Sequence, residues 1–450
     1  MWKHAIVSAL FKQGSRLQPL QYRPVSVTSV CCKVMERAIY SHSVEYLESN
    51  HLLSQFQYGF RAGRSTEDQL LFFYGRVAKW VDAGQVVDVV FLDFAKAFDV
   101  VSHGLLVDKL TSLGFDRHII GWIRSFVMDR TMVVSVEGAL STTRSITSGV
   151  PQGSVLGPLL FLIYANYIAD SVGCCWVAFA DDFMLGLSVS DESEADLQRD
   201  LESIVSRARS WNMNVNPEKC VSMRFGSRTS GRAAAYRIGG IELETVLSYK
   251  DLGIRVDSSL RFHSHIDAVV CKAGGLMCEL LRSTVCRSVE FMLTLFASHI
   301  RPIIDYCSPV WFTGFLGDVR RLESIQRRWT REIAGMSLLD YPNRLRTLEL
   351  YSVYGRLLRA DLVKIWKILN LDSLESLTEL FTLSGETRTR GHRFKLVVPA
   401  CRTEVLRRSF SVRRIATWNS LPPHVVESTS LSSFKRALDD ALSGAFYELV

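Results

Sequence analysis

Acidic residues interrupt two apolar stretches of the chain, and the structural prediction starts from these two stretches. Residues 176–189 read WVAFADDFMLGLSV, in which apolar side chains flank the adjacent carboxylates of Asp181 and Asp182. Val, Phe, Leu and Trp suit strands, and Asp tolerates tight-turn geometry. The pattern therefore predicts a β-hairpin with Asp181 and Asp182 in its turn. Taken alone, such a pair fits a solvated turn as well as it fits a binding site.

A second stretch, residues 86–99, reads VVDVVFLDFAKAFD, and its apolar run from Val86 to Leu92 ends in Asp93. Continuous runs of this kind suit a strand that is covered on both faces. A carboxylate there needs a cation or a metal ion as partner, because an isolated buried charge is costly. We expect Asp93 to join the acidic pair in one cluster, whose hard oxygen ligands suit Mg²⁺. Two such ions can activate a 3′-hydroxyl and stabilise a leaving pyrophosphate.

Elsewhere the apolar spacing predicts helices over 31–46, 103–128 and 191–212, and a largely helical chain from 267 onward. The second of these reads as two helices joined near Gly114. A strand is predicted at 221–225. Residues 318–334 combine apolar side chains at helical spacing with five arginines at the other positions. A basic helix of this kind is either solvated or bound to a nucleic-acid backbone.

Composition narrows the function classes only slightly. The chain has 450 residues, of which 48% are hydrophobic, and a net charge of +7 that favours a polyanionic partner. Its ten cysteines include no Cys-x-x-Cys pair, and no secretory signal is evident, which predicts a reduced intracellular setting. The loose group His263, His265, Cys271 and Cys278 fits no standard zinc spacing. The apolar run 156–169 is too short to predict a membrane span.

Residues 148–161 read SGVPQGSVLGPLLF and form the most specific single run. Its glycines let the backbone approach a ligand closely, and Gln152 offers amide donors. The plainer alternative is a Gly/Pro loop before a core helix. Asp93 upstream and the acidic pair downstream favour a binding loop.

Together the FADD box, the strand-ending Asp93 and the 148–161 run resemble the palm motifs of reverse transcriptases. The closest resemblance is to non-LTR (LINE-type) retrotransposon enzymes of the jockey and CR1-like groups, and it extends over nearly the whole chain. The resemblance implies an α/β (α+β) right-hand polymerase with an antiparallel palm sheet and a helical thumb. The implied domains are fingers 1–85, palm 86–248, primer-grip hairpin and helical thumb or connection 249–383, and a basic C-terminal extension 384–450.

The implied activity is that of an RNA-directed DNA polymerase, which extends a primer 3′-end with dNTPs by two-metal phosphoryl transfer in retrotransposition. By resemblance, Asp93, Asp181 and Asp182 hold two Mg²⁺ ions, for which Mn²⁺ can substitute, and Lys219 protonates the pyrophosphate. The implied nucleotide-binding residues are Lys12, Arg23, Phe94, Ala95, Phe98, Gln152 and Gly153. The implied template-binding residues are Arg61 and Arg64. For each of these residues the plainer alternative is a solvated cation, a core aromatic or a turn.

Two residues near the first acid carry more specific expectations. Phe98, five residues past Asp93, resembles the aromatic gate that collides with a ribose 2′-hydroxyl. Asp99 is expected to cap the helix that follows it. Two departures from the family pattern leave the metal ligands in place: Ala165-Asn166-Tyr167 stands where relatives read Ile-Asn-Asp, and Phe183 stands where they carry Thr.

The partners that the resemblance implies are an RNA template, a DNA primer and dNTPs, with no membrane. Relatives carry an endonuclease upstream, and none precedes the first motif here, so we expect a separate endonuclease to nick the target DNA. A nuclear location is expected. Residues 387–414 hold nine Lys or Arg against Glu404, with Phe394, Phe410 and Trp418 in or beside this stretch. Phosphate neutralisation with aromatic stacking predicts strand binding there.

Two other functions stay open at this point. One is a catalytically inactive, nucleic-acid-binding remnant of a retrotransposon polymerase, against which the three carboxylates argue. The other is a different palm-fold enzyme, such as an RNA-templated RNA polymerase or a nucleotide cyclase. Phe98 and the 148–161 run argue against that second alternative.

Overall fold

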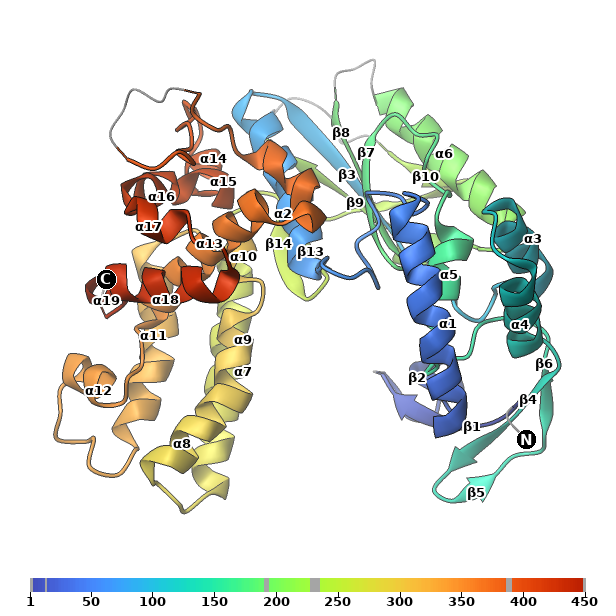
Figure 1. The fold of residues 1–450 in the computed structure, drawn as a ribbon, viewed down its shortest axis with the longest axis horizontal. Coiled ribbons are helices and arrows are strands. Elements are labelled where there is room, and N and C mark those ends of the chain that lie inside the picture. The colour runs from blue at the N-terminus through green and yellow to red at the C-terminus, as the bar shows by residue number, and fades with distance from the viewer. Residues whose placement is uncertain (1–2, 13, 190–193, 227–234, 386–390, 448–450) are drawn as a thin grey trace. The chain divides into compact units, whose positions relative to one another are not determined.

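The computed structural model describes residues 3–12, 14–189, 194–226, 235–385 and 391–447. The chain forms two compact units (Figure 1). The first comprises residues 1–62, 89–222 and 233–245, and the second comprises residues 63–88, 223–232 and 246–450. Within the described ranges, no helix is both long enough and apolar enough to cross a bilayer.

One five-stranded sheet has the strand order β12-β9-β3-β8-β7, with β7 and β8 antiparallel and β12 parallel to β9. All seven residues of β3 are buried, as its continuous apolar pattern predicts. The strands are β3 (Val86–Leu92), β7 (Cys175–Phe179), β8 (Asp182–Val189), β9 (Val221–Phe225) and β12 (Glu244–Thr245).

A second sheet in the first unit has the order β2-β1-β4-β5, with β6 also paired to β4. The sheet is mixed, because β1 runs antiparallel to β2 and parallel to β4. Its strands are β1 (His4–Phe11), β2 (Tyr22–Val27), β4 (Arg130–Val136), β5 (Ala139–Leu140) and β6 (Arg144–Ile146). A small separate hairpin pairs β10 (Arg237–Ile238) with β11 (Ile241–Glu242).

Helices cover the first unit's core, which is one continuous cluster of buried apolar side chains. In Figure 1, α6 lies beside β8. The helices are α1 (Val30–Ser49), α3 (His103–Ser112), α4 (Arg117–Val127), α5 (Gly157–Ala165) and α6 (Glu194–Ser210), with the short η2 (Pro217–Lys219). The predicted helix over 31–46 is confirmed, and so is the break near Gly114. The helix predicted over 191–212 is observed from Glu194 to Ser210, and residues 191–193 lie outside the described residues.

Over its described residues the second unit is mostly helical, and it holds the hairpin β13 (Ser248–Asp251) and β14 (Ile254–Asp257), which the resemblance implies. Helix α11 buries Val319, Leu322, Ile325 and Trp329, which confirms its predicted apolar face. Its first helices are α2 (Thr66–Asp82), α7 (His263–Ser283), α8 (Val289–Leu295), η3 (Phe296–Ile300), α9 (Arg301–Asp305), α10 (Ser308–Trp311) and α11 (Leu316–Arg331). The others are α12 (Tyr341–Thr347), α13 (Val353–Asn370), η4 (Asp372–Leu380), α14 (Glu404–Arg408), α15 (Phe410–Arg413), α16 (Ile415–Ser420), α17 (Pro423–Val426), α18 (Leu431–Ala441) and α19 (Ser443–Phe446).

Part of the basic C-terminal stretch is packed into this unit, which argues against base stacking by Phe410 and Trp418. Arg388 and Arg390 lie outside the described residues, Arg393 and Arg402 are exposed, and strand binding by the stretch stays a prediction.

The buried carboxylate of Asp361 on α13 forms two ion pairs. Its Oδ1 lies 2.6 Å from Nη2 of Arg413, and its Oδ2 lies 3.1 Å from Nε of Arg414. Phe410 and Trp418, two of the aromatics expected to stack on bases, are buried. The buried carboxylate of Asp361 needs charged partners, and these two arginines supply them. The ion pairs and the buried rings thereby fix this stretch against α13.

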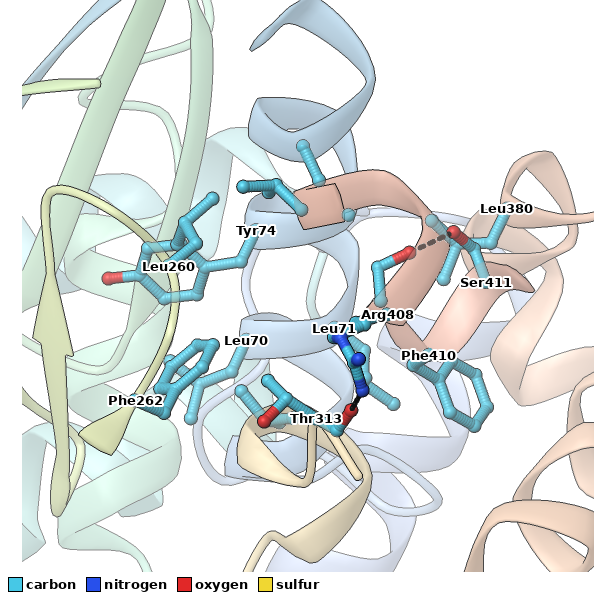
Figure 2. Close-up of a pocket in the computed structure, with 15 residues that line it drawn as sticks. Leu70, Leu71, Tyr74, Leu260, Phe262, Thr313, Leu380, Arg408, Phe410 and Ser411 are labelled. Atoms are coloured by element: carbon cyan, nitrogen blue, oxygen red, sulfur yellow. Dashed lines mark hydrogen bonds between the residues drawn. The ribbon is translucent and has the colours of Figure 1, made fainter. Parts of the chain in front are cut away.

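A small cavity of about 40 Å³ lies beside α2 in the second unit, and Figure 2 shows its lining. Leu70, Leu71 and Tyr74 of α2 face Phe262, which precedes α7. From the opposite side, the Arg408 guanidinium donates a hydrogen bond to the carbonyl of Thr313 over 3.2 Å. The lining is mostly apolar, so an unpaired polar atom there is costly.

The Thr313 hydroxyl is such an atom, because it is buried and has no hydrogen-bond partner. We predict that Thr313→Val, which keeps the shape and removes the hydroxyl, raises the free energy of unfolding by about 1 kcal/mol. Thr313→Ser keeps the hydroxyl and loses a methyl group, so it should lower that free energy by about 1 kcal/mol. Urea unfolding of the full chain measures both. A less stable valine variant would contradict this account.

Candidate active site

The acidic hairpin differs in one detail from the sequence prediction. The two turn residues are Ala180 and Asp181, whereas Asp182 is the first residue of β8 and pairs with Phe179. The prediction of both acids in the turn is therefore wrong by one residue. Ala180 adopts φ of +59°, a left-handed conformation that a residue with a Cβ rarely takes. Backbone strain of this kind persists only where neighbouring groups hold it.

Gln57 supplies that support. Its side-chain oxygen accepts hydrogen bonds from the backbone N–H groups of Ala180 and Gly59, each over 2.9 Å. Its amide nitrogen donates to the carbonyl of Ala180 over 3.3 Å. At Gly59 an added Cβ would lie 2.4 Å from the Ala180 nitrogen, so only glycine allows this approach. The residues before α2 thus clamp the turn that presents Asp181.

Asp93 follows the last residue of β3, which lies directly beside β8 in the sheet. Its carbonyl accepts from the N–H of Asn216 over 2.8 Å, and its own N–H donates to the Cys220 thiol over 3.4 Å. The carboxylate oxygen Oδ2 is buried without a hydrogen bond, although the Lys219 ammonium lies 3.3 Å from it. The backbone is therefore fixed while one carboxylate oxygen keeps its coordinating capacity.

The three carboxylates influence one another electrostatically. Restricted hydration raises the pKa of Asp181, and the charge of Asp93 adds to this. Asp182 has an exposed surface, but protein atoms crowd its carboxyl, and with the charges of Asp181 and Asp93 they raise its pKa to about 6. The positive charges of Lys12 and Arg23 act in the opposite direction on both groups. The predicted acids and these two predicted cations therefore share one electrostatic site.

The carboxylate oxygens of Asp93, Asp181 and Asp182 are ligands of the type that a divalent cation prefers. In the described part of the chain, no three His, Cys, Asp or Glu side chains stand in ready-made metal-binding geometry. Mg²⁺ does not require such a cage, because it usually takes one or two carboxylates together with substrate phosphates and water. Oδ2 of Asp93 accepts no hydrogen bond in the described structure, although the Lys219 ammonium lies 3.3 Å from it. A bound cation would coordinate this oxygen and offset the repulsion among the three acids.

The 148–161 loop is held from two directions. The amide of Gln152 donates to Oδ1 of Asp99 over 2.9 Å, and its carbonyl accepts from the N–H of Ser26 over 2.7 Å. Gly153 has φ of +101°, and an added Cβ would lie 2.7 Å from the Ser26 carbonyl. The expectation that Asp99 caps the next helix is wrong, since the N-cap of α3 is Ser102. Asp99 orients Gln152 instead.

Phe94 and Ala95, which follow Asp93, can contact a ligand mainly through their backbone atoms. Phe94 is buried against Phe183, so only its main chain can meet a ligand, and the N–H of Ala95 is used by the Asn214 carbonyl. Phe98 is half-buried and stacks on Phe161 with ring centroids 4.4 Å apart. That stacking gives the predicted gate a rigid backing.

The family described as "Reverse transcriptase (RNA-dependent DNA polymerase)" matches residues 12–256, more than half of the chain. The chain belongs to the reverse transcriptase family. A similar curated protein is the probable RNA-directed DNA polymerase from transposon BS of Drosophila melanogaster, 29% identical over 87% of this chain and 42% of its own length. The RNA-directed DNA polymerase from mobile element jockey of the same species is 28% identical over 74% of this chain and 38% of its own length.

The chain thus spans less than half the length of these curated relatives. They are retrotransposon proteins, which confirms the resemblance to the jockey group. Among solved structures, an apo telomerase from Candida tropicalis is similar with a TM-score of 0.45 and 11% identity, over 98% of this chain and 67% of that chain. Likeness at that level carries no inference about the site.

Two departures from the reverse transcriptase pattern have structural explanations. Tyr167, which stands where relatives carry Asp, braces the loop before Gln57, because its hydroxyl donates to the Leu52 carbonyl over 3.0 Å. Phe183, which follows the acidic pair, packs in the core against Phe94. Both residues therefore stabilise the scaffold of the acidic hairpin.

One supporting residue had no signal in the sequence. Glu36 on α1 is completely buried, and its Oε2 accepts from the backbone N–H groups of Val155 and Leu156 over 2.7 and 3.1 Å. It thereby anchors the end of the 148–161 loop. A single Glu within an amphipathic helix looks like a solvated position, so periodicity alone could not have identified it.

The two arginines predicted to bind template belong to different units. The Arg61 side chain is only 8% exposed, and its Nη2 lies 2.5 Å from Oε2 of Glu48 while Nη1 donates to the Ser54 carbonyl over 2.7 Å. This placement makes Arg61 a brace of the first unit and argues against the predicted template contact. Arg64 is half-buried in the second unit, and its role stays a prediction.

The clamp on the acidic turn gives a testable consequence. Gln57→Ala leaves the N–H groups of Ala180 and Gly59 without their acceptor, so the free energy of unfolding should fall by about 2–3 kcal/mol. Gln55→Ala, at an exposed position in the same loop, should cost much less. Chemical unfolding measures both variants. Equal losses would show that Gln57 does not hold the turn.

Proposed function

We propose that this chain catalyses RNA-directed DNA synthesis at the acidic site of its first unit. The observation that carries the proposal is the shared electrostatic site of Asp93, Asp181 and Asp182, with Lys12 and Arg23 acting on it. Membership of the reverse transcriptase family supports it. The substrates are dNTPs, an RNA template and a DNA primer, and the setting is retrotransposition.

Asp93 and Asp181 would hold Mg²⁺, or Mn²⁺ in its place, and Asp182 would support them. Such ions activate the primer 3′-hydroxyl and neutralise the leaving pyrophosphate. Three acids in one site fit this role, because like charges are tolerated where a cation belongs.

The other residues bind and orient the nucleotide. Lys12 and Arg23 are exposed cations that attract the triphosphate, and Arg can bind phosphate oxygens with both arms of its guanidinium. Gln152, oriented by Asp99, lies on the loop that borders the nucleotide. Phe98, backed by Phe161, excludes a 2′-hydroxyl.

The Nζ of Lys219 lies 3.3 Å from the Asp93 carboxylate. In this position the ammonium can neutralise charge on the departing pyrophosphate and give it a proton. A nuclear location would follow from copying RNA at chromosomal target sites, and it stays a prediction, as does the separate endonuclease.

Primer extension on an RNA template with purified protein tests the proposal. Asp181→Asn should reduce dNTP incorporation at least about a hundredfold, because a metal ligand is lost while the side-chain shape is kept. It should not lower the melting temperature, since it removes a charge from a crowded acidic site. Asp108→Asn, on the exposed face of α3, is the matched control and should retain full activity.

Incorporation that persists in Asp181→Asn would refute the assigned metal ligand. A wild-type protein that binds template–primer but extends nothing would identify the inactive remnant instead. Incorporation of rNTPs in preference to dNTPs would point to an RNA polymerase and remove the assigned gate role of Phe98.

A further inference from the structure

Two segments of the first unit, residues 98–103 and 148–152, are joined by a set of hydrogen bonds that we call the clasp. The first segment carries Phe98, the predicted gate, and the second carries Gln152, which is predicted to border the nucleotide. The backbone N–H of Val150 donates to the carbonyl of Phe98 over 2.9 Å. The backbone of the gate is therefore tied directly to the loop that carries Gln152.

Gly149 is the central residue of the clasp, because both polar groups of its backbone bond to the first segment. Its N–H donates to the carbonyl of Val101 over 2.8 Å, and its carbonyl accepts from Nε2 of His103 over 2.8 Å. Gly149 has φ of +88°, and an added Cβ would lie 2.8 Å from the carbonyl oxygen of Asp99. Only glycine therefore allows the two segments to approach this closely.

His103 supplies the clasp with a side-chain donor from a rigid element. It is the first residue of α3, and it is buried. A carbonyl oxygen can only accept a hydrogen bond, so Nε2 of His103 carries the hydrogen. Leu106 and Leu110 of the same helix are completely buried in the core of the unit. The position of the imidazole ring is therefore set by the packing of α3.

The clasp connects the two side chains that are predicted to border the nucleotide. Asp99 accepts the hydrogen bond from the Gln152 amide, and the adjacent Phe98 has its ring stacked on Phe161. If the clasp loosens, the loop and the gate can move relative to each other. A nucleotide that contacts both would then meet a less precisely placed site.

We propose that His103 is a positioning residue for sugar selection, which holds the 148–152 segment against the segment that carries Phe98. This inference rests on the proposed polymerase function, because it gives His103 a part in choosing dNTPs over rNTPs. His103 is buried, so it acts through the loop and not on the nucleotide itself. Discrimination between substrates is a difference in transition-state binding, which small displacements of the contacting groups reduce strongly.

A plainer explanation is that His103 only satisfies a buried carbonyl, as polar side chains in protein cores commonly do. In that case, loss of the imidazole would lower the stability of the protein and leave its choice of nucleotide unchanged. Selectivity and stability therefore have to be measured side by side.

The test compares three substitutions of His103 in the full chain, by incorporation of dATP and of ATP on an oligouridine template. His103→Ala removes the donor, so the ratio of kcat/KM for dATP to kcat/KM for ATP should fall about tenfold. His103→Gln keeps an N–H donor near the place of the ring Nε2, and its ratio should stay within about twofold of the wild-type value. His103→Asn places its donor nearer the helix, so it should behave like His103→Ala.

The matched control is Tyr46→Phe, which acts at the opposite end of the same helix. The Tyr46 hydroxyl donates to the carbonyl of Leu113, the C-cap residue of α3, over 2.9 Å. Like His103→Ala, this variant loses a side-chain bond to a carbonyl, so both should have a lower melting temperature than the wild type. Only His103→Ala should change the ratio, because Tyr46 does not belong to the clasp.

Hydrogen exchange of the peptide that spans residues 148–152 tests the clasp without polymerisation. Loss of the His103 donor should speed exchange of the Gly149 and Val150 N–H groups about tenfold, because local opening becomes easier. His103→Gln and Tyr46→Phe should exchange like the wild type. The comparison of His103→Gln with His103→Asn does not depend on the alanine variant folding, since both keep a polar side chain at this position.

An unchanged ratio in His103→Ala and His103→Asn would overturn the proposal. So would an equal decrease in Tyr46→Phe, or a ratio that follows the melting temperature across all variants. A wild-type protein that extends no primer would remove the proposed polymerase function, and the role in sugar selection with it. The exchange measurement distinguishes that result from failure of the clasp, because it shows whether His103 holds the loop.

Discussion

The structure depends on one unfavourable arrangement, the gathering of three carboxylates at one end of a buried sheet. Asp93 follows β3, Asp181 lies in the β7–β8 turn, and Asp182 begins β8. Their mutual repulsion and restricted hydration raise the pKa of Asp182 to about 6. A fold tolerates such crowding where cations compensate it, and here Lys12 and Arg23 do so in part. We propose that a divalent ion and a nucleotide bind there and compensate the remaining negative charge.

Much of the surrounding scaffold keeps these acids in place. Gln57 holds the strained turn at Ala180, the Asn216 N–H holds the Asp93 backbone, and Glu36 anchors the loop that carries Gln152. Each contact joins segments that are distant in the chain. Rigid support of this kind is what phosphoryl transfer requires, because its catalysis rests on positioning and electrostatics. In the second unit, the negative charge of buried Asp361 is compensated within the protein, by ion pairs with two arginines.

The sequence was sufficient to predict those helices and strands in which buried residues recur at regular spacing. The apolar run of β3 and the apolar face of α11 have the predicted form, and the β13–β14 hairpin has the form that the resemblance implies. The hairpin turn was misplaced by one residue, because the left-handed conformation of Ala180 depends on Gln57 and Gly59 rather than on its own preference. A lone alanine carries no signal for such a turn.

Polar side chains were harder to assign, because their partners lie far away in sequence. Asp99 looked like a helix cap, but Gln152 takes its carboxylate. Arg61 looked like a template contact, but Glu48 binds it inside the unit. In the basic C-terminal stretch, Arg413 and Arg414 looked available to a nucleic acid, but Asp361 is their partner. The sequence shows where charged side chains stand along the chain. It does not show whether each one pairs with another residue of the fold or with a ligand.

The most direct measurement of the central claim is anomalous diffraction from crystals of the protein with Mn²⁺, a primer–template and a non-hydrolysable dNTP analogue. The account predicts metal density about 2 Å from carboxylate oxygens of both Asp93 and Asp181, with the triphosphate bound beside it. Metal density away from these two residues, or a nucleotide bound with no metal near them, would contradict it.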